Sequence, residues 1–130
     1  MKPLLNFCLI DDSAFDLFIY EKLLIKSGIT DSVKTFNSAR DALKHLLTEG
    51  TGLPDTIILL DLQMPDMNGF EFIDEFAALP DYLKNKVRIF MLSSTIDTRD
   101  IEKAKASPHI IDLLPKPLEV NFLKSKLELN

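Results

Sequence analysis

The 130-residue sequence lacks the features that mark several specialised classes of protein. Its one cysteine, Cys8, excludes an internal disulfide and fits a small core residue. Its 15 Lys and Arg residues are scattered and outnumbered by 20 Asp and Glu residues, so no basic stripe for nucleic acid is present. No apolar run reaches the length of a membrane-spanning helix, and no charged and apolar leader precedes the first one. We therefore expect a cytoplasmic protein that does not insert into a membrane.

What the sequence does contain is typical of one globular domain over residues 1–130. Hydrophobic residues make up 46% of the chain and charged residues 27%, and there is no internal repeat or low-complexity stretch. A chain of this length is long enough to bury a substantial core.

The most informative stretch is IILLDLQMPDMNG, at residues 57–69. Four apolar residues lead directly into Asp61, and a turn with Pro65, Asn68 and Gly69 follows. An unbroken apolar run bounded by turn residues is typical of a strand buried on both faces, as in a parallel sheet. Functional groups of such sheets lie just past the carboxyl ends of the strands, so we expect Asp61 to face a crevice there.

Similar patterns predict the other elements. Predicted strands cover residues 4–10, 32–36, 57–60, 87–92 and 110–114, and predicted helices cover 14–26, 39–47, a segment between Gly69 and Pro80, 97–106 and 118–129. In the first helix, Phe15, Ile19 and Leu23 recur at helical spacing and predict its buried face. Loops are expected at 49–55 and 81–86. Alternating strands and helices predict a doubly wound α/β fold: a five-stranded parallel sheet, flavodoxin-like (βα)5, with strand order 2-1-3-4-5.

Because the carboxyl ends of parallel strands lie along one edge, this fold brings together side chains from four strands. They are Asp11, Asp12, Asp61, Ser93 and Lys116. Three carboxylates in one crevice repel one another, and a divalent cation removes the conflict. Magnesium prefers such oxygen ligands, whereas no His or Cys ligand favours zinc. With the lysine and hydroxyl, these groups suit phosphoryl transfer to an Asp carboxylate.

These motifs resemble the receiver domain of two-component response regulators, and the resemblance covers the whole chain. It is carried by Asp11-Asp12, by Asp61 to Pro65 with Gly69, by Ser93-Ser94 and by Lys116-Pro117. Each motif is weak alone, but all four in order at successive strand ends are specific.

The resemblance implies a role for each acidic residue. Asp61 matches the residue that accepts a phosphoryl group from a phosphohistidine. Asp12, Asp61 and the backbone carbonyl of Gln63 match the magnesium ligands, and Asp11 matches the acid that reaches the metal through water.

The resemblance also implies a switch. Ser93 matches the hydroxyl that bonds the arriving phosphoryl group, and Lys116 matches the lysine that pairs with the acceptor carboxylate and then with the phosphoryl group. The Lys116–Pro117 bond is expected to be cis, as it usually is in this family. Leu113 stands where many receivers carry a Tyr or Phe that reports the switch state, so an aromatic relay is not implied.

The implied partners are a sensor histidine kinase or a histidine phosphotransfer protein, and an unknown downstream protein. Nothing follows the last predicted helix, so the chain resembles receivers without an output domain. By family analogy, the downstream partner docks on the helix at 97–106, the last strand and the last helix. Such a protein is a signalling switch and not an enzyme with an external substrate.

Other functions share parts of this pattern. An Asp-nucleophile phosphatase typically needs a second Asp two residues after the nucleophile, where this chain has Gln63. A flavin-binding electron carrier needs a phosphate loop after the first strand, and Asp11-Asp12 would repel the phosphate. A receiver-like adaptor that works without phosphorylation usually lacks one of the site residues, and none is lacking here.

Structural interpretations of the same residues also exist. Asp11 and Asp12 are suitable caps for the first helix. Ser93 can cap the next helix, although Asp97 is better placed for that. Lys116, between two prolines, can be an ordinary surface lysine.

Overall fold

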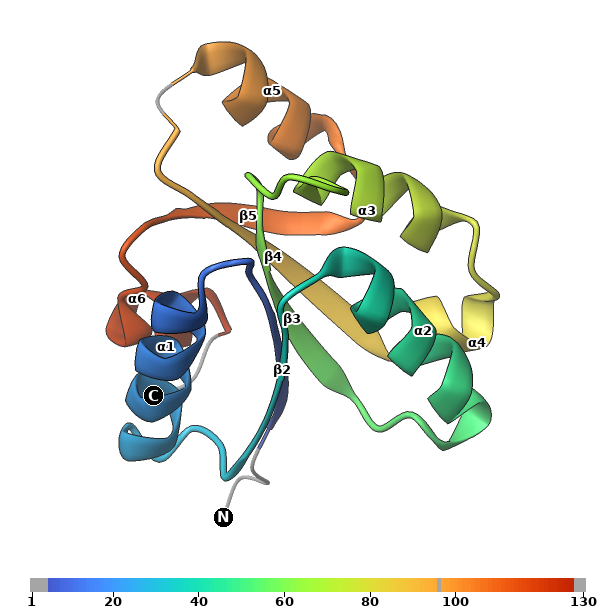
Figure 1. The fold of residues 1–130 in the computed structure, drawn as a ribbon, viewed down its shortest axis with the longest axis horizontal. Coiled ribbons are helices and arrows are strands. Elements are labelled where there is room, and N and C mark those ends of the chain that lie inside the picture. The colour runs from blue at the N-terminus through green and yellow to red at the C-terminus, as the bar shows by residue number, and fades with distance from the viewer. Residues whose placement is uncertain (1–4, 96, 128–130) are drawn as a thin grey trace.

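The computed structural model describes residues 5–95 and 97–127, which form a five-stranded parallel sheet flanked by helices (Figure 1). The order β2-β1-β3-β4-β5 confirms the predicted fold class and topology. The strands are β1 (Asn6–Ile10), β2 (Ser32–Phe36), β3 (Thr56–Asp61), β4 (Val87–Ser93) and β5 (Ile110–Pro115). The helices are α1 (Ala14–Lys26), α2 (Ala39–Glu49), α3 (Gly69–Ala77), α4 (Asp81–Lys84), α5 (Thr98–Ala106) and α6 (Val120–Lys126), with a 3-10 helix at Gly50–Gly52.

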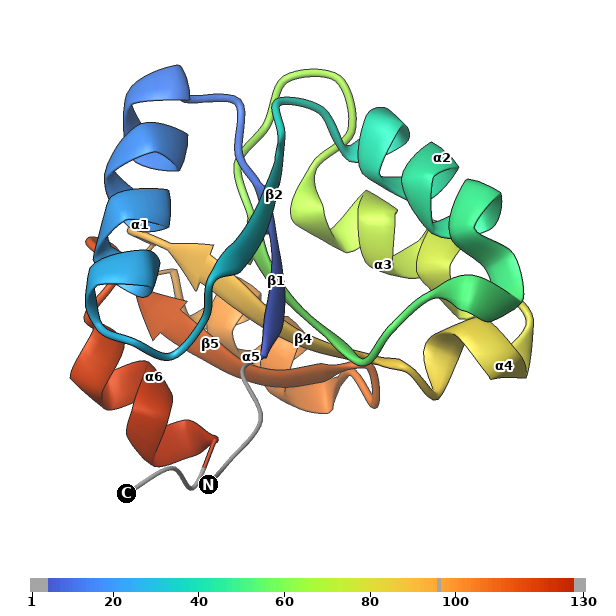
Figure 2. The ribbon, with the colours of Figure 1, turned by 90° about the horizontal axis from the view of Figure 1, so that it is seen from below.

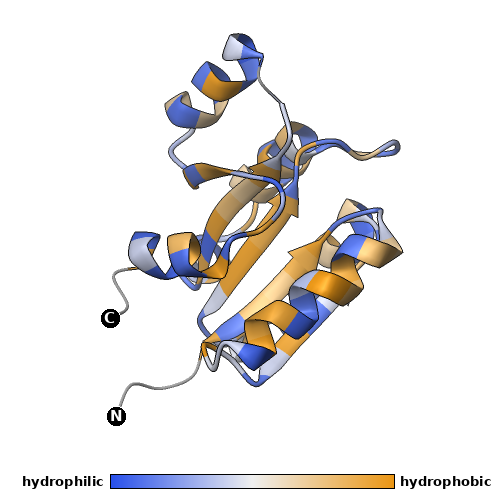
Figure 3. Cartoon of the chain, turned by 90° about the vertical axis from the view of Figure 1, so that its left-hand side faces the viewer, coloured by the Kyte–Doolittle hydropathy of each residue, from blue (hydrophilic) through white to orange (hydrophobic). Residues whose placement is uncertain are grey.

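The sheet separates two layers of helices, with α1 and α6 on one face and α2 and α3 on the other (Figure 2). Every residue of β3 is buried, and strongly hydrophobic stretches lie along the sheet (Figure 3). Cys8 on β1 lies in the core, as predicted, and burial raises the pKa of its thiol to about 12. The central strand that carries Asp61 is therefore held from both sides.

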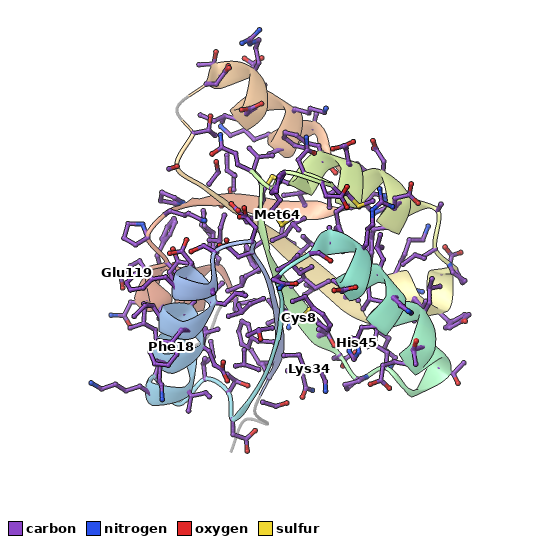
Figure 4. The ribbon with its side chains drawn as sticks, in the orientation of Figure 1. Cys8, Phe18, Lys34, His45, Met64 and Glu119 are labelled. Atoms are coloured by element: carbon purple, nitrogen blue, oxygen red, sulfur yellow. The ribbon has the colours of Figure 1, made fainter. Side chains whose placement is uncertain are left out.

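The predicted buried face of α1 was wrong for Phe15 and Leu23, whereas Ile19 is partly buried against the core. Phe15 is 72% exposed and Leu23 39% exposed, and the buried residues are instead Leu17, Tyr20 and Leu24. Figure 4 shows Phe18, another exposed residue, on the outer side of this helix. Apolar residues occur all around α1, so helical spacing alone does not identify the face that packs on the sheet.

Two connections contain more structure than the sequence predicted. The predicted loop at 81–86 includes α4, because Leu83 is fully buried and anchors a helical turn in the core. The predicted loop at 49–55 includes the 3-10 helix. The first residues of the predicted strand at 4–10 and the end of the predicted helix at 118–129 lie partly outside the described residues.

Side-chain caps fix where the helices begin. Ser13 and Ser38 cap α1 and α2, and Asp97 caps α5, as predicted, by accepting from the backbone of Arg99 at 2.9 Å. None of the helices in the described ranges is long and apolar enough to cross a lipid bilayer.

Candidate functional site

The carboxyl ends of β1, β3, β4 and β5 bring the predicted site residues to one edge of the sheet. Asp11, Asp61 and Ser93 are buried, with 3%, 4% and 3% of their surface exposed, whereas Asp12 is exposed. One carboxylate oxygen of each of the three Asp residues lies within 4.8 Å of the other two. The three acids therefore form one cluster, here called the acidic pocket, and Asp12 is its solvent-exposed member.

Lys116 joins these acids from the end of β5. Its Nζ donates to Asp11 Oδ2 at 3.0 Å and lies 3.2 Å from Asp61 Oδ1. Its backbone N–H donates to the Ser93 carbonyl at 3.0 Å, which holds the start of the next segment against β4. The Lys116–Pro117 bond is cis, as the resemblance implied. The interpretation of Lys116 as an ordinary surface lysine is wrong, because its side chain is only 18% exposed and is ion-paired.

Asp16 is a site residue that the sequence analysis missed. Its carboxylate accepts a hydrogen bond from Lys116 Nζ at 3.1 Å. The residue lies in the first turn of α1, where an acid is ordinarily explained by the helix dipole. One signal was available: Asp16 precedes Tyr20 and Leu24 by one and two helical turns, and those two residues belong to the buried stripe.

The pocket carries more negative than positive charge. Burial raises the pKa of Asp61 to about 6, and the neighbouring charge of Asp11 adds to the shift, while Lys116 opposes it. Burial alone would lower the pKa of Lys116, but the Asp11 hydrogen bond and the Asp61 charge hold it above its ordinary value. The lysine is thus fully charged, and the single ammonium does not offset all of the neighbouring carboxylates.

The loop between β3 and α3 surrounds Asp61 from outside. The exposed Gln63 donates its backbone N–H to Asp61 Oδ1 at 3.4 Å, and the exposed Pro65 follows. Gly69 begins α3 beside the strand end: a Cβ there would lie 3.0 Å from the Asp61 carbonyl oxygen and 3.0 Å from Leu62 Cα. This close approach explains glycine at position 69 without invoking an unusual backbone angle.

On the β4 side of the pocket, hydrogen bonds between residues close in sequence order the chain after the strand. Ser93 Oγ accepts from the Thr95 backbone N–H at 2.9 Å, and the Thr95 hydroxyl donates to Asp100 at 3.2 Å. Ser94 is exposed, and Leu113 is partly buried against the core. Because Asp97 caps α5, Ser93 is not needed as the cap and remains at the pocket.

The donor set fits a hard divalent cation. It consists of carboxylate oxygens, with the Gln63 backbone beside them. Burial, and then the charge of Asp11, raise the pKa of Asp61, and a bound cation would favour its ionised form. Magnesium prefers oxygen ligands and commonly takes one or two protein carboxylates together with water. Asp11, Asp12 and Asp61 are the residues that would hold it.

Comparison with known proteins agrees with this geometry. The family model for the response regulator receiver domain matches residues 7–128. In a sequence comparison, no curated protein matches the chain.

Solved structures are similar over nearly the whole chain. A response regulator receiver protein from Dyadobacter fermentans is 56% identical, with a TM-score of 0.89 and 95% of both chains covered. A two-component response regulator from Cytophaga hutchinsonii is 30% identical, with a TM-score of 0.87, covering 98% of this chain and 96% of that one. The Vibrio cholerae chemotaxis protein CheY4 is 25% identical, with a TM-score of 0.75, covering 97% of this chain and 98% of that one.

Proposed function

The chain belongs to the response regulator receiver domain family, and we propose that it takes up a phosphoryl group on Asp61 and acts as a signalling switch. The donor is a phosphohistidine on a sensor histidine kinase or a histidine phosphotransfer protein. The observation that supports this best is the surroundings of Asp61: a buried carboxylate with an ammonium 3.2 Å away and two further carboxylates within 4.8 Å. Membership of the family implies partners in two-component signalling, and the proposal places the chain in the cytoplasm with them.

The proposed chemistry is a single phosphoryl transfer. A carboxylate oxygen of Asp61 forms a bond to phosphorus as the phosphorus–nitrogen bond of the phosphohistidine breaks. The imidazole keeps the electron pair of that bond and takes up a proton from water. The product is an aspartyl phosphate, and no oxidant or reductant takes part.

Positive charge is the main requirement of this step, because negative charge spreads over the phosphoryl oxygens. A magnesium ion bound by Asp12, Asp61 and the Gln63 carbonyl, with Asp11 acting through water, would supply part of that charge. Lys116 supplies the rest from within the fold, since its ammonium already lies beside the acceptor oxygen.

The proposed output is a change in population between two arrangements of the domain. Ser93 and Lys116 would bond the new phosphoryl oxygens and so favour one arrangement. Partners would then bind the surface formed by α5, β5 and α6, where Ile111 and Phe122 are 50% and 40% exposed. The downstream partner is a protein, and turnover of an external substrate is not part of the proposal.

The residue that is modified can be located directly. We would incubate the protein with phosphoramidate, a small phosphorus–nitrogen donor, and Mg²⁺, and then reduce it with borohydride, which converts an aspartyl phosphate to homoserine. Tandem mass spectrometry of the peptide is expected to find homoserine at position 61. Homoserine only at Asp66, an exposed carboxylate of the same loop, would refute the assignment. An unmodified, folded protein would favour the adaptor function instead.

A further inference from the structure

We propose that Asp16 is a positioning residue that keeps the Lys116 ammonium beside Asp61 when a divalent cation enters the acidic pocket. The inference rests on the proposed phosphoacceptor function of Asp61. It concerns a contact between helix α1 and the end of strand β5, which are far apart in the sequence.

The ammonium of Lys116 has three carboxylate neighbours. Its Nζ lies 3.0 Å from Asp11 Oδ2, 3.1 Å from Asp16 Oδ2 and 3.2 Å from Asp61 Oδ1. The lysine side chain is 18% exposed and that of Asp16 is 28% exposed, so solvent screens this contact less than it screens a surface pair. An ammonium has three N–H donors, and two of them are hydrogen-bonded to Asp11 and Asp16, while Asp61 is an ion-pair partner.

Asp16 differs from the other two neighbours in one respect. Asp11 and Asp61 belong to the group of carboxylates that would hold a cation, and Asp16 does not. A cation held by Asp11 and Asp61 would compete with the Lys116 ammonium for their oxygens and would repel it. Asp16 is then the neighbour that still offers Lys116 an unshared carboxylate.

This arrangement leaves the lysine ready for the phosphoryl group. With one N–H bonded to Asp16, Nζ stays near the acceptor while its other donors turn to the phosphoryl oxygens. Without Asp16, the long and flexible lysine side chain has to be ordered during the reaction, at an entropic cost.

The chain itself supplies a matched control. Asp16 is the third residue of α1, and its backbone N–H donates to the cap Ser13 Oγ at 3.1 Å. Asp41 is the third residue of α2, and its backbone N–H donates to the cap Ser38 Oγ at 3.1 Å. Asp41 is exposed, and its side chain makes no ion pair with the described residues. Asp16→Asn and Asp41→Asn therefore remove the same first-turn charge, but only Asp16→Asn removes a partner of Lys116.

The first test measures the lysine directly and does not depend on phosphorylation. The ammonium signal of Lys116 is identified by nitrogen-15 NMR from its absence in Lys116→Arg, and its order parameter is measured with and without Mg²⁺. The wild type and Asp41→Asn are expected to keep an ordered ammonium with Mg²⁺, and Asp16→Asn to lose that order. An ammonium that stays equally ordered in Asp16→Asn with Mg²⁺ overturns the proposal.

The second test measures the rate of phosphoryl uptake from phosphoramidate at saturating Mg²⁺. Asp16→Asn is expected to react roughly threefold to tenfold more slowly than Asp41→Asn, in the lower part of the range of about twofold to 150-fold that coupling energies between contacting residues correspond to. Asp16→Glu, which keeps the charge, should restore most of the rate. Loss of a negative charge near the incoming phosphoryl group would by itself speed the reaction, so an equal or faster rate contradicts the positioning role.

Failure of this inference can be told from failure of the proposed function. If the wild type takes up no phosphoryl group, the function fails, and the NMR result still decides whether Asp16 positions Lys116. If the wild type reacts and Asp16→Asn matches Asp41→Asn in both tests, only the inference fails. Circular dichroism checks that each variant is folded, and Asp16→Ser replaces Asp16→Asn in both tests if the latter is not.

Discussion

At the scale of single residues, the site is built around a carboxylate that the fold makes costly to ionise. Asp61 is 4% exposed and faces Asp11, so its pKa is raised to about 6. Lys116 offsets part of this cost, and a cation would offset more. A functional group held in an unfavourable charge state is a common property of binding and catalytic sites.

In the metal-free protein, ionisation of Asp61 lowers the stability of the fold. Because the pKa of Asp61 is higher in the fold than in the unfolded chain, the fold binds more protons between about pH 4 and pH 6. The contribution of Asp61 to stability is therefore full below about pH 4 and is lost as the pH rises through about 6. We expect Asp61→Asn to be more stable than the wild type at pH 7.5 by about 1–3 kcal/mol, with a smaller difference at pH 4.5.

Urea unfolding in the presence of a chelator measures this difference. Asp66→Asn, which removes an exposed carboxylate of the same loop, serves as the control and should change stability little at either pH. A difference between Asp61→Asn and the wild type that is the same at both pH values would contradict the electrostatic account.

At the scale of elements, the junction between β3 and α3 determines where Asp61 lies. Gly69 opens α3 directly beside the strand end, and its backbone N–H donates to the Leu62 carbonyl at 2.9 Å. A capping box between Asn68 and Glu71 then fixes the first turn of the helix. The turn can be this tight because position 69 has no Cβ.

We expect Gly69→Ala to lower the free energy of unfolding by about 1–3 kcal/mol, because the added Cβ meets backbone atoms of Asp61 and Leu62 at 3.0 Å. Gly52→Ala is the matched control, since a Cβ there has no atom within 4 Å and no positive φ is required. Thermal unfolding of both variants tests this. If Gly69→Ala were as stable as Gly52→Ala, the close packing of α3 on the strand end would not constrain the site.

The first helix shows where sequence reasoning stops at this scale. Phe15 and Leu23 have the spacing of a buried face, yet the stripe that packs on the sheet is Leu17, Tyr20 and Leu24. Asp16 lies on the same side of α1, one turn before Tyr20, and a polar residue there does not look like part of a buried face. Its carboxylate accepts a hydrogen bond from Lys116. Local periodicity can place the partly buried Asp16 on that stripe, but it cannot identify the distant partner that explains an acid there.

At the scale of the whole molecule, the rules of parallel sheets made most of the fold predictable. Right-handed crossovers and alternating elements led to the observed strand order, and the sheet edge led to Asp11, Asp61, Ser93 and Lys116. Apart from the short helical turns in two connections, what could not be predicted depends on the rotation of helices about their axes. That rotation decides the contact between α1 and Lys116, and it follows from packing over the entire face of the sheet.

A cation that relieves repulsion in the pocket should stabilise the whole domain. We expect Mg²⁺ to raise the midpoint of thermal unfolding of the wild type, by an amount that grows with concentration, because it binds the folded state. The effect should be much reduced in Asp12→Asn and retained in Asp31→Asn, an exposed acid outside the pocket. Equal stabilisation of the two variants would place the cation elsewhere.

The most direct test of the central claim is the intact mass of the protein after incubation with acetyl phosphate and Mg²⁺, measured beside Asp61→Asn and Asp66→Asn. We predict a single phosphoryl adduct on the wild type and on Asp66→Asn, absent without Mg²⁺ and labile at alkaline pH, as an acyl phosphate is. Asp61→Asn should show none. An equally abundant adduct on Asp61→Asn would contradict the assignment of Asp61 as the phosphoacceptor.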